Sequence, residues 1–201
     1  MELKISNSKV NVDKKGIRVL GIAESFIKKK TKKSILAGVV MRVDGIIDGI
    51  TLSSATIGGM DATESIISLF NSLKRRDINV IILNGCVISW FNIIDLEEVY
   101  RRAKIPLICI TYDESIGLKK YLKEYFKNDW ENRYKIYRKN GGREKIELHT
   151  KNFIFVRVLG LELEKAKMLL DKLTIHGSIP EPLRISRLYA RAVLKHIIKE
   201  N

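Results

Sequence analysis

The sequence contains no glutamine and, in 201 residues, only two cysteines, three histidines and three prolines. Cys86 and Cys109 form no CxxC pair and have few histidine partners, so we expect two buried thiols and no zinc site. Abundant lysine, isoleucine and glutamate without glutamine is typical of proteins from heat-loving organisms, in which a disulfide stays an alternative. The GxSxG motif of serine hydrolases and the GxxxxGK motif of phosphate-binding loops are also missing.

Long hydrophobic runs are missing too. No stretch of about 18 uncharged apolar residues exists, and the N-terminal residues lack the apolar core of a signal peptide. We therefore expect a cytoplasmic protein with no membrane association. Length and the lack of a linker predict one domain over residues 1–201, in which residues 1–15 could form a peripheral N-terminal segment. The oligomeric state is not predicted.

The net charge of +14 is unevenly distributed. Lysine and arginine outnumber the acids in residues 1–34, 119–145 and 181–201, whereas residues 35–118 contain more acids than bases. This distribution favours a polyanionic partner, because phosphate backbones attract lysine and arginine irrespective of sequence. Nucleic acid is the predicted partner, and a solvated, solubilising surface is the alternative.

Hydrophobic patterning predicts three consecutive strands and then alternating helices and strands. The apolar, β-branched runs follow one another closely at first, as in an antiparallel meander. Later runs such as VIILNG (80–85) are continuously apolar and separated by helices, as in a parallel sheet covered on both faces. Up to residue 111 the predicted strands are 17–23, 35–43, 45–53, 80–85 and 105–111, and the predicted helices are 61–76 and 93–103.

The remaining residues predict four more helices and a hairpin. Gly141 and Gly142 mark a turn before two alternating segments, and Pro182 opens the last helix. The predicted helices are 116–126, 130–139, 161–173 and 181–199, and the hairpin strands are 145–149 and 153–158.

The order βββαβαβ is that of the ribonuclease H-like α/β fold. Four motifs then resemble an uncharacterised archaeal protein family related to endonuclease V. The resemblance covers residues 16–195 and implies a mixed five-stranded sheet of order 3-2-1-4-5, flanked by helices, with a C-terminal hairpin and helices. The motifs are GIAESF (21–26), GGMDATES (58–65), LNGCVISWFN (83–92) and IPEPLRISRL (179–188).

The resemblance implies a former nuclease site. In endonuclease V, aspartates at the ends of the first and fourth strands bind the catalytic divalent metal. The matching positions here are Ala23 and Asn84, and Glu64 matches a third acidic residue on the following helix. Magnesium requires hard anionic oxygens, so we expect a catalytically degenerate site with no cofactor. The lesion-binding wedge and a lysine of endonuclease V are also not matched.

A rebuilt metal site is the alternative. Glu24 and Asp113 could join Glu64 in holding magnesium or manganese. Adjacent side chains on a strand face opposite sides, so Glu24 would reach the site only if its strand bulges or ends there. A loop with Asp113 or Ser115 as the cap of the next helix is the preferred interpretation of Asp113.

Two basic clusters are the predicted nucleic-acid contacts. One lies between the first two predicted strands, and the other forms a stripe on the last helix, with a solvated outer face as the alternative. The apolar side opposite this stripe is predicted to contain Ile185, Leu188, Tyr189 and Ala192. The predicted contacts are Lys28, Lys29, Lys30, Lys32, Lys33, Arg184, Arg187 and Arg191.

Aromatic residues interleave with cations in residues 121–139, and Trp90 and Phe91 follow the fourth predicted strand. They could stack bases, with core packing as the alternative. Three functions therefore stand at the level of sequence: a degenerate nuclease fold that binds nucleic acid, which is preferred, an active metal-dependent endonuclease, and a protein-interaction or small-ligand module that uses the former active-site cleft.

Overall fold

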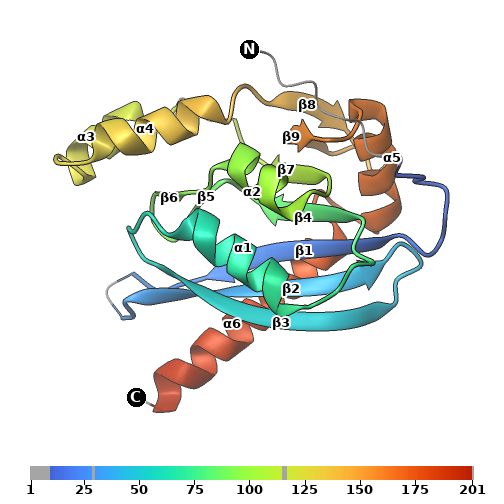
Figure 1. Ribbon diagram of the computed structural model, residues 1–201, viewed down its shortest axis with the longest axis horizontal. Helices are drawn as coiled ribbons and strands as arrows, with labels where there is room; N and C mark the ends of the chain where they lie inside the picture. The colour runs from blue at the N-terminus through green and yellow to red at the C-terminus, as the bar shows by residue number, and fades with distance from the viewer. Residues whose placement is uncertain (1–9, 29, 115–116, 201) are drawn as a thin grey trace.

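The computed structural model describes residues 10–28, 30–114 and 117–200. A seven-stranded mixed sheet of order β3-β2-β1-β4-β7-β9-β8 forms its centre, with helices on both faces (Figure 1). The strands of this sheet are β1 (Arg18–Ser25), β2 (Lys33–Arg42), β3 (Ile47–Thr56), β4 (Val80–Asn84), β7 (Leu107–Thr111), β8 (Glu144–Glu147) and β9 (Phe153–Leu159). The helices are α1 (Ala62–Ser72), α2 (Leu96–Ala103), α3 (Lys119–Tyr125), α4 (Trp130–Lys139), α5 (Leu163–Leu173) and α6 (Glu181–Glu200).

The predicted fold class is confirmed, with one correction to the sheet. The five predicted strands have the expected order: β1 pairs antiparallel with β2, β2 with β3, and β1, β4 and β7 run parallel. The predicted hairpin, β8 and β9, joins the same sheet because β9 pairs antiparallel with β7. The prediction of five strands was therefore two short, since the hairpin covers the otherwise open edge of β7.

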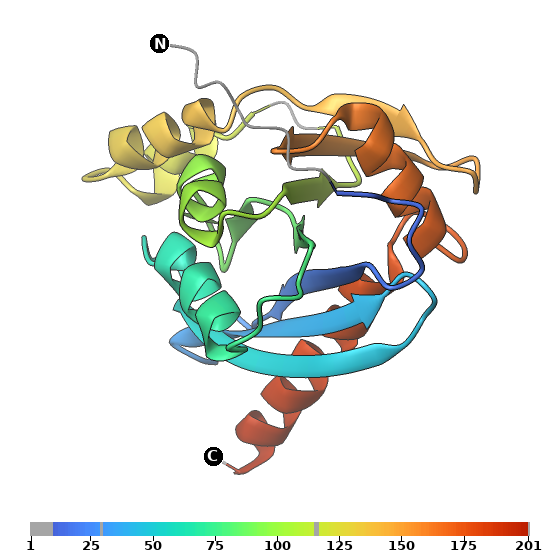
Figure 2. The ribbon, with the colours of Figure 1, turned by 45° about the vertical axis from the view of Figure 1, so that its right-hand side comes forward.

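A small two-stranded sheet was not predicted. It consists of β5 (Val87–Ile88) and β6 (Asn92–Ile93), joined by a turn at residues 89–91 (Figure 2). Ser89, Trp90 and Phe91 all have positive φ angles, of 46°, 57° and 63°. Non-glycine residues seldom adopt this conformation, so the sequence carries no local signal for the turn.

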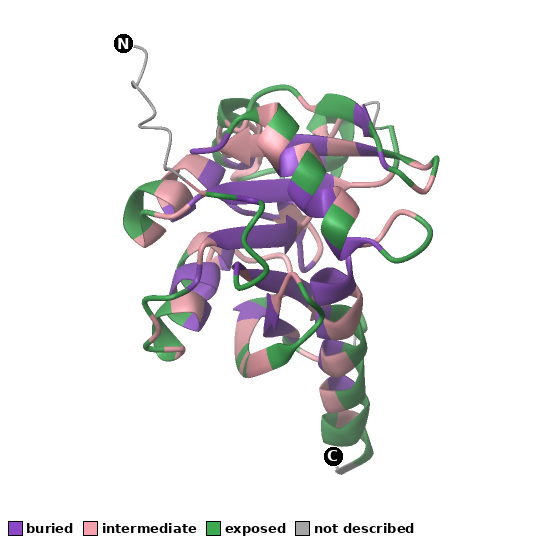
Figure 3. Ribbon diagram, turned by 90° about the vertical axis from the view of Figure 1, so that its right-hand side faces the viewer, coloured by how far each residue is buried: buried purple, intermediate pink, exposed green. Residues whose placement is uncertain are grey.

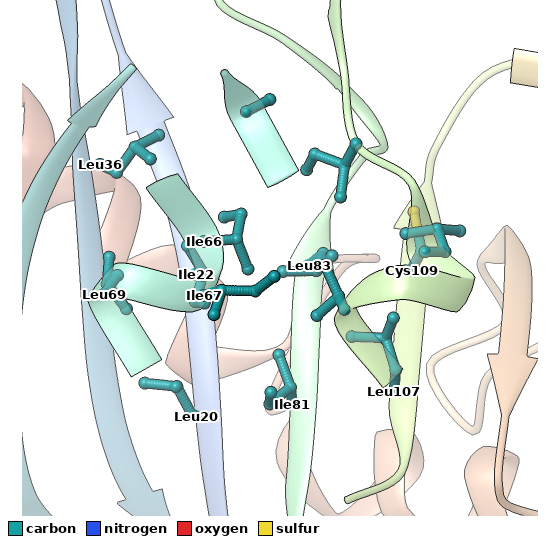
Figure 4. Close-up of a cluster of buried hydrophobic side chains, with 14 of the residues drawn as sticks. Leu20, Ile22, Leu36, Ile66, Ile67, Leu69, Ile81, Leu83, Leu107 and Cys109 are labelled. Carbon is teal, nitrogen blue, oxygen red and sulfur yellow. The ribbon is translucent and has the colours of Figure 1, made fainter. Parts of the chain in front are cut away.

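Two apolar clusters explain why β4 and β7 are continuously apolar. One face of the sheet packs against α1 and α2, where Leu20, Ile22, Leu36 and Leu83 meet Ile66 and Leu69 (Figure 4). The other face packs Val19, Ile82 and Ile108 against α5 and α6. Successive residues of the central strands therefore enter opposite layers, and both layers exclude water.

The packing of α6 corrects one prediction. Its buried side consists of Leu183, Ser186, Ala190 and Leu194, whereas Leu188 is 51% exposed and Ala192 is exposed as well. The predicted apolar side was wrong because the buried line of the helix runs through two small residues, Ser186 and Ala190, between Leu183 and Leu194. The C-terminal part of the helix is largely exposed (Figure 3). No helix in the described part of the chain is long and apolar enough to cross a membrane.

Candidate functional site

A cleft of about 570 Å³ opens beside the C-terminal ends of β4 and β7. In open α/β sheets, ligands bind at the carboxyl ends of parallel strands, and this cleft occupies that position. Residues from both faces of the sheet contribute to it. Its charged and polar lining includes Glu24, Asn84, Tyr112, Asp113, Glu114, Arg143, Arg157 and Arg187.

Ala23 and Asn84 lie on neighbouring strands at this end of the sheet. Ile22 pairs with Leu83 in the parallel register of β1 and β4, so Ala23 and Asn84 are the next pair. Ala23 is 3% exposed, and Asn84 is half-buried and lines the cleft. The pair offers a methyl group and one neutral carbonyl oxygen, which is weak coordination for a hard divalent ion.

Glu24 faces the opposite layer from Ala23. Strand β1 pairs with both neighbours without a bulge, so alternation places Glu24 on the side of Ile22. The backbone N–H of Ser89 donates to both Glu24 carboxylate oxygens at 2.8 Å, and Ser89 Oγ donates to Oε2 at 2.6 Å. Burial raises the pKa of the Glu24 carboxyl, against the opposing effect of these bonds. Glu24 thus lines the cleft while it holds the turn after β5.

The other two predicted metal ligands are more exposed than Glu24 and have other partners. Glu64 is 66% exposed in its side chain and forms an ion pair with Arg102 of α2. Asp113 is exposed at the cleft, and its backbone carbonyl accepts a hydrogen bond from Arg143 Nη1 at 2.9 Å. Within residues 10–28, 30–114 and 117–200, no three His, Cys, Asp or Glu side chains gather into a group that could hold a metal ion. As arranged, the donors do not fit the divalent ion of endonuclease V.

Three arginines line the cleft together with the carboxylates of Glu24, Asp113 and Glu114. Arg157 is 7% exposed, donates to the Gly141 carbonyl at 3.1 Å and lies 3.6 Å from Cys86 Sγ. Arg143 donates to Thr111 Oγ1 at 2.9 Å, and Arg187 projects from α6 as an exposed residue. Sequence reasoning missed Arg143 and Arg157. The signal for Arg157 was a single charge inside the apolar strand FIFVRVL.

The two cysteines are buried, as predicted, and both thiols are free. A hydrogen bond from Cys109 to Cys86 lowers the pKa of the Cys86 thiol, and the nearby Arg157 charge acts in the same direction against burial. The same hydrogen bond and burial raise the pKa of Cys109. Cys86 and Arg157 both line the cleft.

The predicted basic contacts have different surroundings. Lys28 Nζ lies 3.9 Å from the centroid of the Trp90 ring. Arg184 is bound by the buried Glu181, whereas Arg187 and Arg191 are exposed. Lys30, Lys32 and Lys33 are exposed, and Lys29 lies outside the described residues.

Arg133 of α4 joins two of the sequence motifs. It is 3% exposed and donates to the carbonyls of Gly58 and Gly59 at 2.8 Å and of Phe91 at 2.9 Å. Its guanidinium also lies 3.8 Å from the centroid of the Phe126 ring. The glycine-rich loop before α1 and the turn after β5 are therefore fixed to each other through one side chain.

This topology, with a cleft at the ends of its parallel strands, is that of the ribonuclease H-like fold. The chain belongs to the endonuclease dU family, whose sequence pattern matches residues 15–194. A UPF0215 protein of Pyrobaculum calidifontis is 33% identical over 183 residues, which cover 90% of this chain and 100% of the relative. The predicted relationship to an archaeal family is confirmed.

Solved structures agree with the fold. A protein of unknown function from Archaeoglobus fulgidus has a TM-score of 0.75 and 28% identity, with 89% of this chain and 98% of that chain covered. Endonuclease V of Ciona intestinalis, solved with an inosine-containing 24mer DNA, has a TM-score of 0.63 and 17% identity. The match covers 96% of this chain and 91% of that one.

Proposed function

We propose that this protein binds nucleic acid in the cleft at the ends of β4 and β7, and that Arg143 and Arg187 contact phosphates there. The observation that carries the proposal is the convergence of three arginines in one cleft at this edge of the sheet. The planar guanidinium group of arginine can donate two hydrogen bonds at once to phosphate oxygens. The DNA bound to the Ciona intestinalis endonuclease V and the net charge of +14 support the same partner.

Binding should weaken steeply with salt. Phosphate contacts release counterions, so the affinity should fall by orders of magnitude between 50 and 200 mM salt. Each phosphate contact that is removed should reduce the slope of log affinity against log salt concentration by about one unit. We expect Arg187→Gln to bind several-fold more weakly than the unmodified protein and with a shallower salt slope, in fluorescence anisotropy with labelled DNA and RNA. Arg101→Gln is the matched control, because Arg101 is an exposed arginine on α2, outside the cleft. An affinity that salt leaves unchanged would contradict the proposal.

The same proposal includes a degenerate catalytic site, since Ala23 and Asn84 replace two acidic ligands and Glu64 forms an ion pair with Arg102.

The second candidate function is that of an active metal-dependent endonuclease. The family description, endonuclease dU, favours it, and so does the presence of Glu24 and Asp113 on one cleft. One experiment distinguishes the two candidates. The protein is incubated with magnesium or manganese and with strands that contain deoxyuridine, inosine or ordinary bases. Intact strands support the degenerate site, whereas cleavage that Glu24→Gln abolishes selects the second candidate.

Restoring the missing carboxylates should create metal-dependent stability. The double variant Ala23→Asp/Asn84→Asp places two carboxylates side by side, so their repulsion should lower Tm without metal. Manganese should then raise Tm again. At a manganese concentration of 100 times Kd, binding to the folded state increases the free energy of unfolding by about 2.7 kcal/mol.

Each single variant should gain less, because the two carboxylates act on one ion and their effects are not additive. The unmodified protein is the control, measured by thermal unfolding with and without manganese. If it gains as much from the metal as the double variant, the native residues already hold the ion and the degenerate site is refuted.

A further inference from the structure

An aromatic cluster is connected to residues that line the cleft. We call it the aromatic platform, and it consists of Trp90, Phe91, Tyr121, Tyr125 and Phe126. The Phe91 ring is stacked with that of Tyr125, at a centroid distance of 5.9 Å and an interplanar angle of 29°. It is stacked in the same way with Tyr121, at 6.4 Å and 25°. Trp90 lies 5.7 Å from Tyr125 and 5.1 Å from Phe126.

Two connections join the platform to the cleft. Glu24 lines the cleft and binds the backbone of Ser89, the residue before Trp90. Leu118 also lines the cleft and directly precedes α3, the helix that carries Tyr121 and Tyr125. The residues that line the cleft and the residues that carry the rings are therefore joined through one hydrogen bond and through the start of α3.

The protein fixes the platform at the cost of an unfavourable backbone. Three successive positive φ angles at residues 89–91 turn both rings toward α3, and each such angle costs of order 1 kcal/mol or more. The turn is held by Glu24, by Arg133 and by the Gly58 N–H, which donates to the Ser89 carbonyl at 2.7 Å. A Cβ at Gly58 would lie 2.9 Å from the Trp90 ring, so only glycine leaves room for that ring.

The platform is partly open to solvent, and cations lie over its rings and over a neighbouring ring. Tyr121 and Tyr125 are 42% and 46% exposed, and Trp90 and Phe91 are half-buried. Lys28 Nζ lies over the rings of Trp90 and Tyr125, and Lys123 Nζ lies 4.6 Å from the centroid of Trp130 on the neighbouring helix. Exposed aromatic rings beside lysine ammonium groups are suited to a ligand with flat faces and negative charge.

We propose that the aromatic platform stacks unpaired bases of the nucleic-acid strand that the cleft holds, so that the protein prefers single-stranded or locally unpaired substrates. The inference rests on the proposed function and adds the class of substrate to it. Lys28 occupies the Trp90 face in the free protein, and its flexible, exposed chain moves to a neighbouring phosphate when a base takes that face.

The test removes ring faces without changing charge. The double variant Tyr121→Leu/Tyr125→Leu should bind a single strand about 5-fold to more than 100-fold more weakly, since stacking contributes about 1–3 kcal/mol per base. Its affinity for the duplex and its salt slope should stay as in the unmodified protein. Phe153→Leu is the matched control, because Phe153 is 52% exposed and has a lysine ammonium 4.8 Å from its ring centroid, on the β8–β9 hairpin.

A second measurement reports on Trp90 directly. The chain has two tryptophans, so Trp130→Phe leaves Trp90 as the fluorophore, and a single strand should quench it more than a duplex does. Equal losses on single strand and duplex, an unchanged single-strand affinity, or no quenching would overturn the inference. If the unmodified protein binds with steep salt dependence but the platform variant binds equally well, only this inference fails. If the unmodified protein binds no nucleic acid at all, the proposed function fails with it.

Discussion

Replacing Arg133 by methionine should lower the free energy of unfolding by about 3–5 kcal/mol, the loss that follows removal of one partner from a buried charged network. The substitution leaves three backbone carbonyls, at Gly58, Gly59 and Phe91, without their donor. It also removes the partner of Asp129 Oδ2, which accepts from Arg133 Nε at 2.9 Å. Urea unfolding, followed by circular dichroism, measures the change.

Two further variants make this test specific. Arg138→Met alters an exposed arginine in the last turn of the same helix, and we expect a change within about 0.5 kcal/mol. Arg133→Lys should remain strongly destabilised, because an ammonium group cannot reproduce the planar fork that reaches several acceptors. Equal effects of Arg133→Met and Arg138→Met would show that Arg133 does not hold the two loops together.

The second large effect is expected at Gly21. A Cβ on Gly21 would lie 2.6 Å from the carbonyl carbon of Pro182 and 2.7 Å from its Cβ, and backbone at that distance has to move. The shift would also break the bond that Ser186 Oγ donates to the Gly21 carbonyl at 2.7 Å. Gly21→Ala should therefore cost about 3 kcal/mol, at the upper end of the range for overpacking.

Gly16→Ala is the control for this substitution, because a Cβ there would meet nothing within 4 Å. We expect it to leave the urea midpoint unchanged to within the error of the measurement. If Gly21→Ala were equally harmless, α6 would be able to slide on β1, and its close contact with that strand would not be a requirement of the fold.

The sheet could be predicted from sequence where burial alone determines the residue pattern. Strands β4 and β7 have apolar side chains on both faces, so a continuous apolar run identified them and implied covering helices. The β8–β9 hairpin was predicted from alternating segments after the turn at Gly141 and Gly142, but its place beside β7 was not predicted. Strands at the edge of a sheet pair through backbone hydrogen bonds, which do not require particular side chains. The sequence therefore could not show that β9 pairs with β7.

The candidate site was predictable in position and less so in detail. The resemblance to endonuclease V implied that Ala23 lies beside Asn84, and the register of β1 and β4 places them on neighbouring strands. The orientation of Glu24 followed from alternation, but its partner did not, because Ser89 reaches it only through a turn of unusual backbone conformation. Arg157 was missed because one charged residue in an apolar strand does not indicate which groups or cleft its side chain faces.

The contact of Ser186 with Gly21 spans 165 residues of chain. Such a contact forms late in folding, because the entropy of closing a long loop is lost before the contact can repay it. On the ribosome, β1 emerges early and its Gly21 surface stays uncovered until α6 has been synthesised. Folding of this protein is therefore expected to finish after translation of α6, and the nascent chain exposes the sheet face that α6 later covers during most of its synthesis.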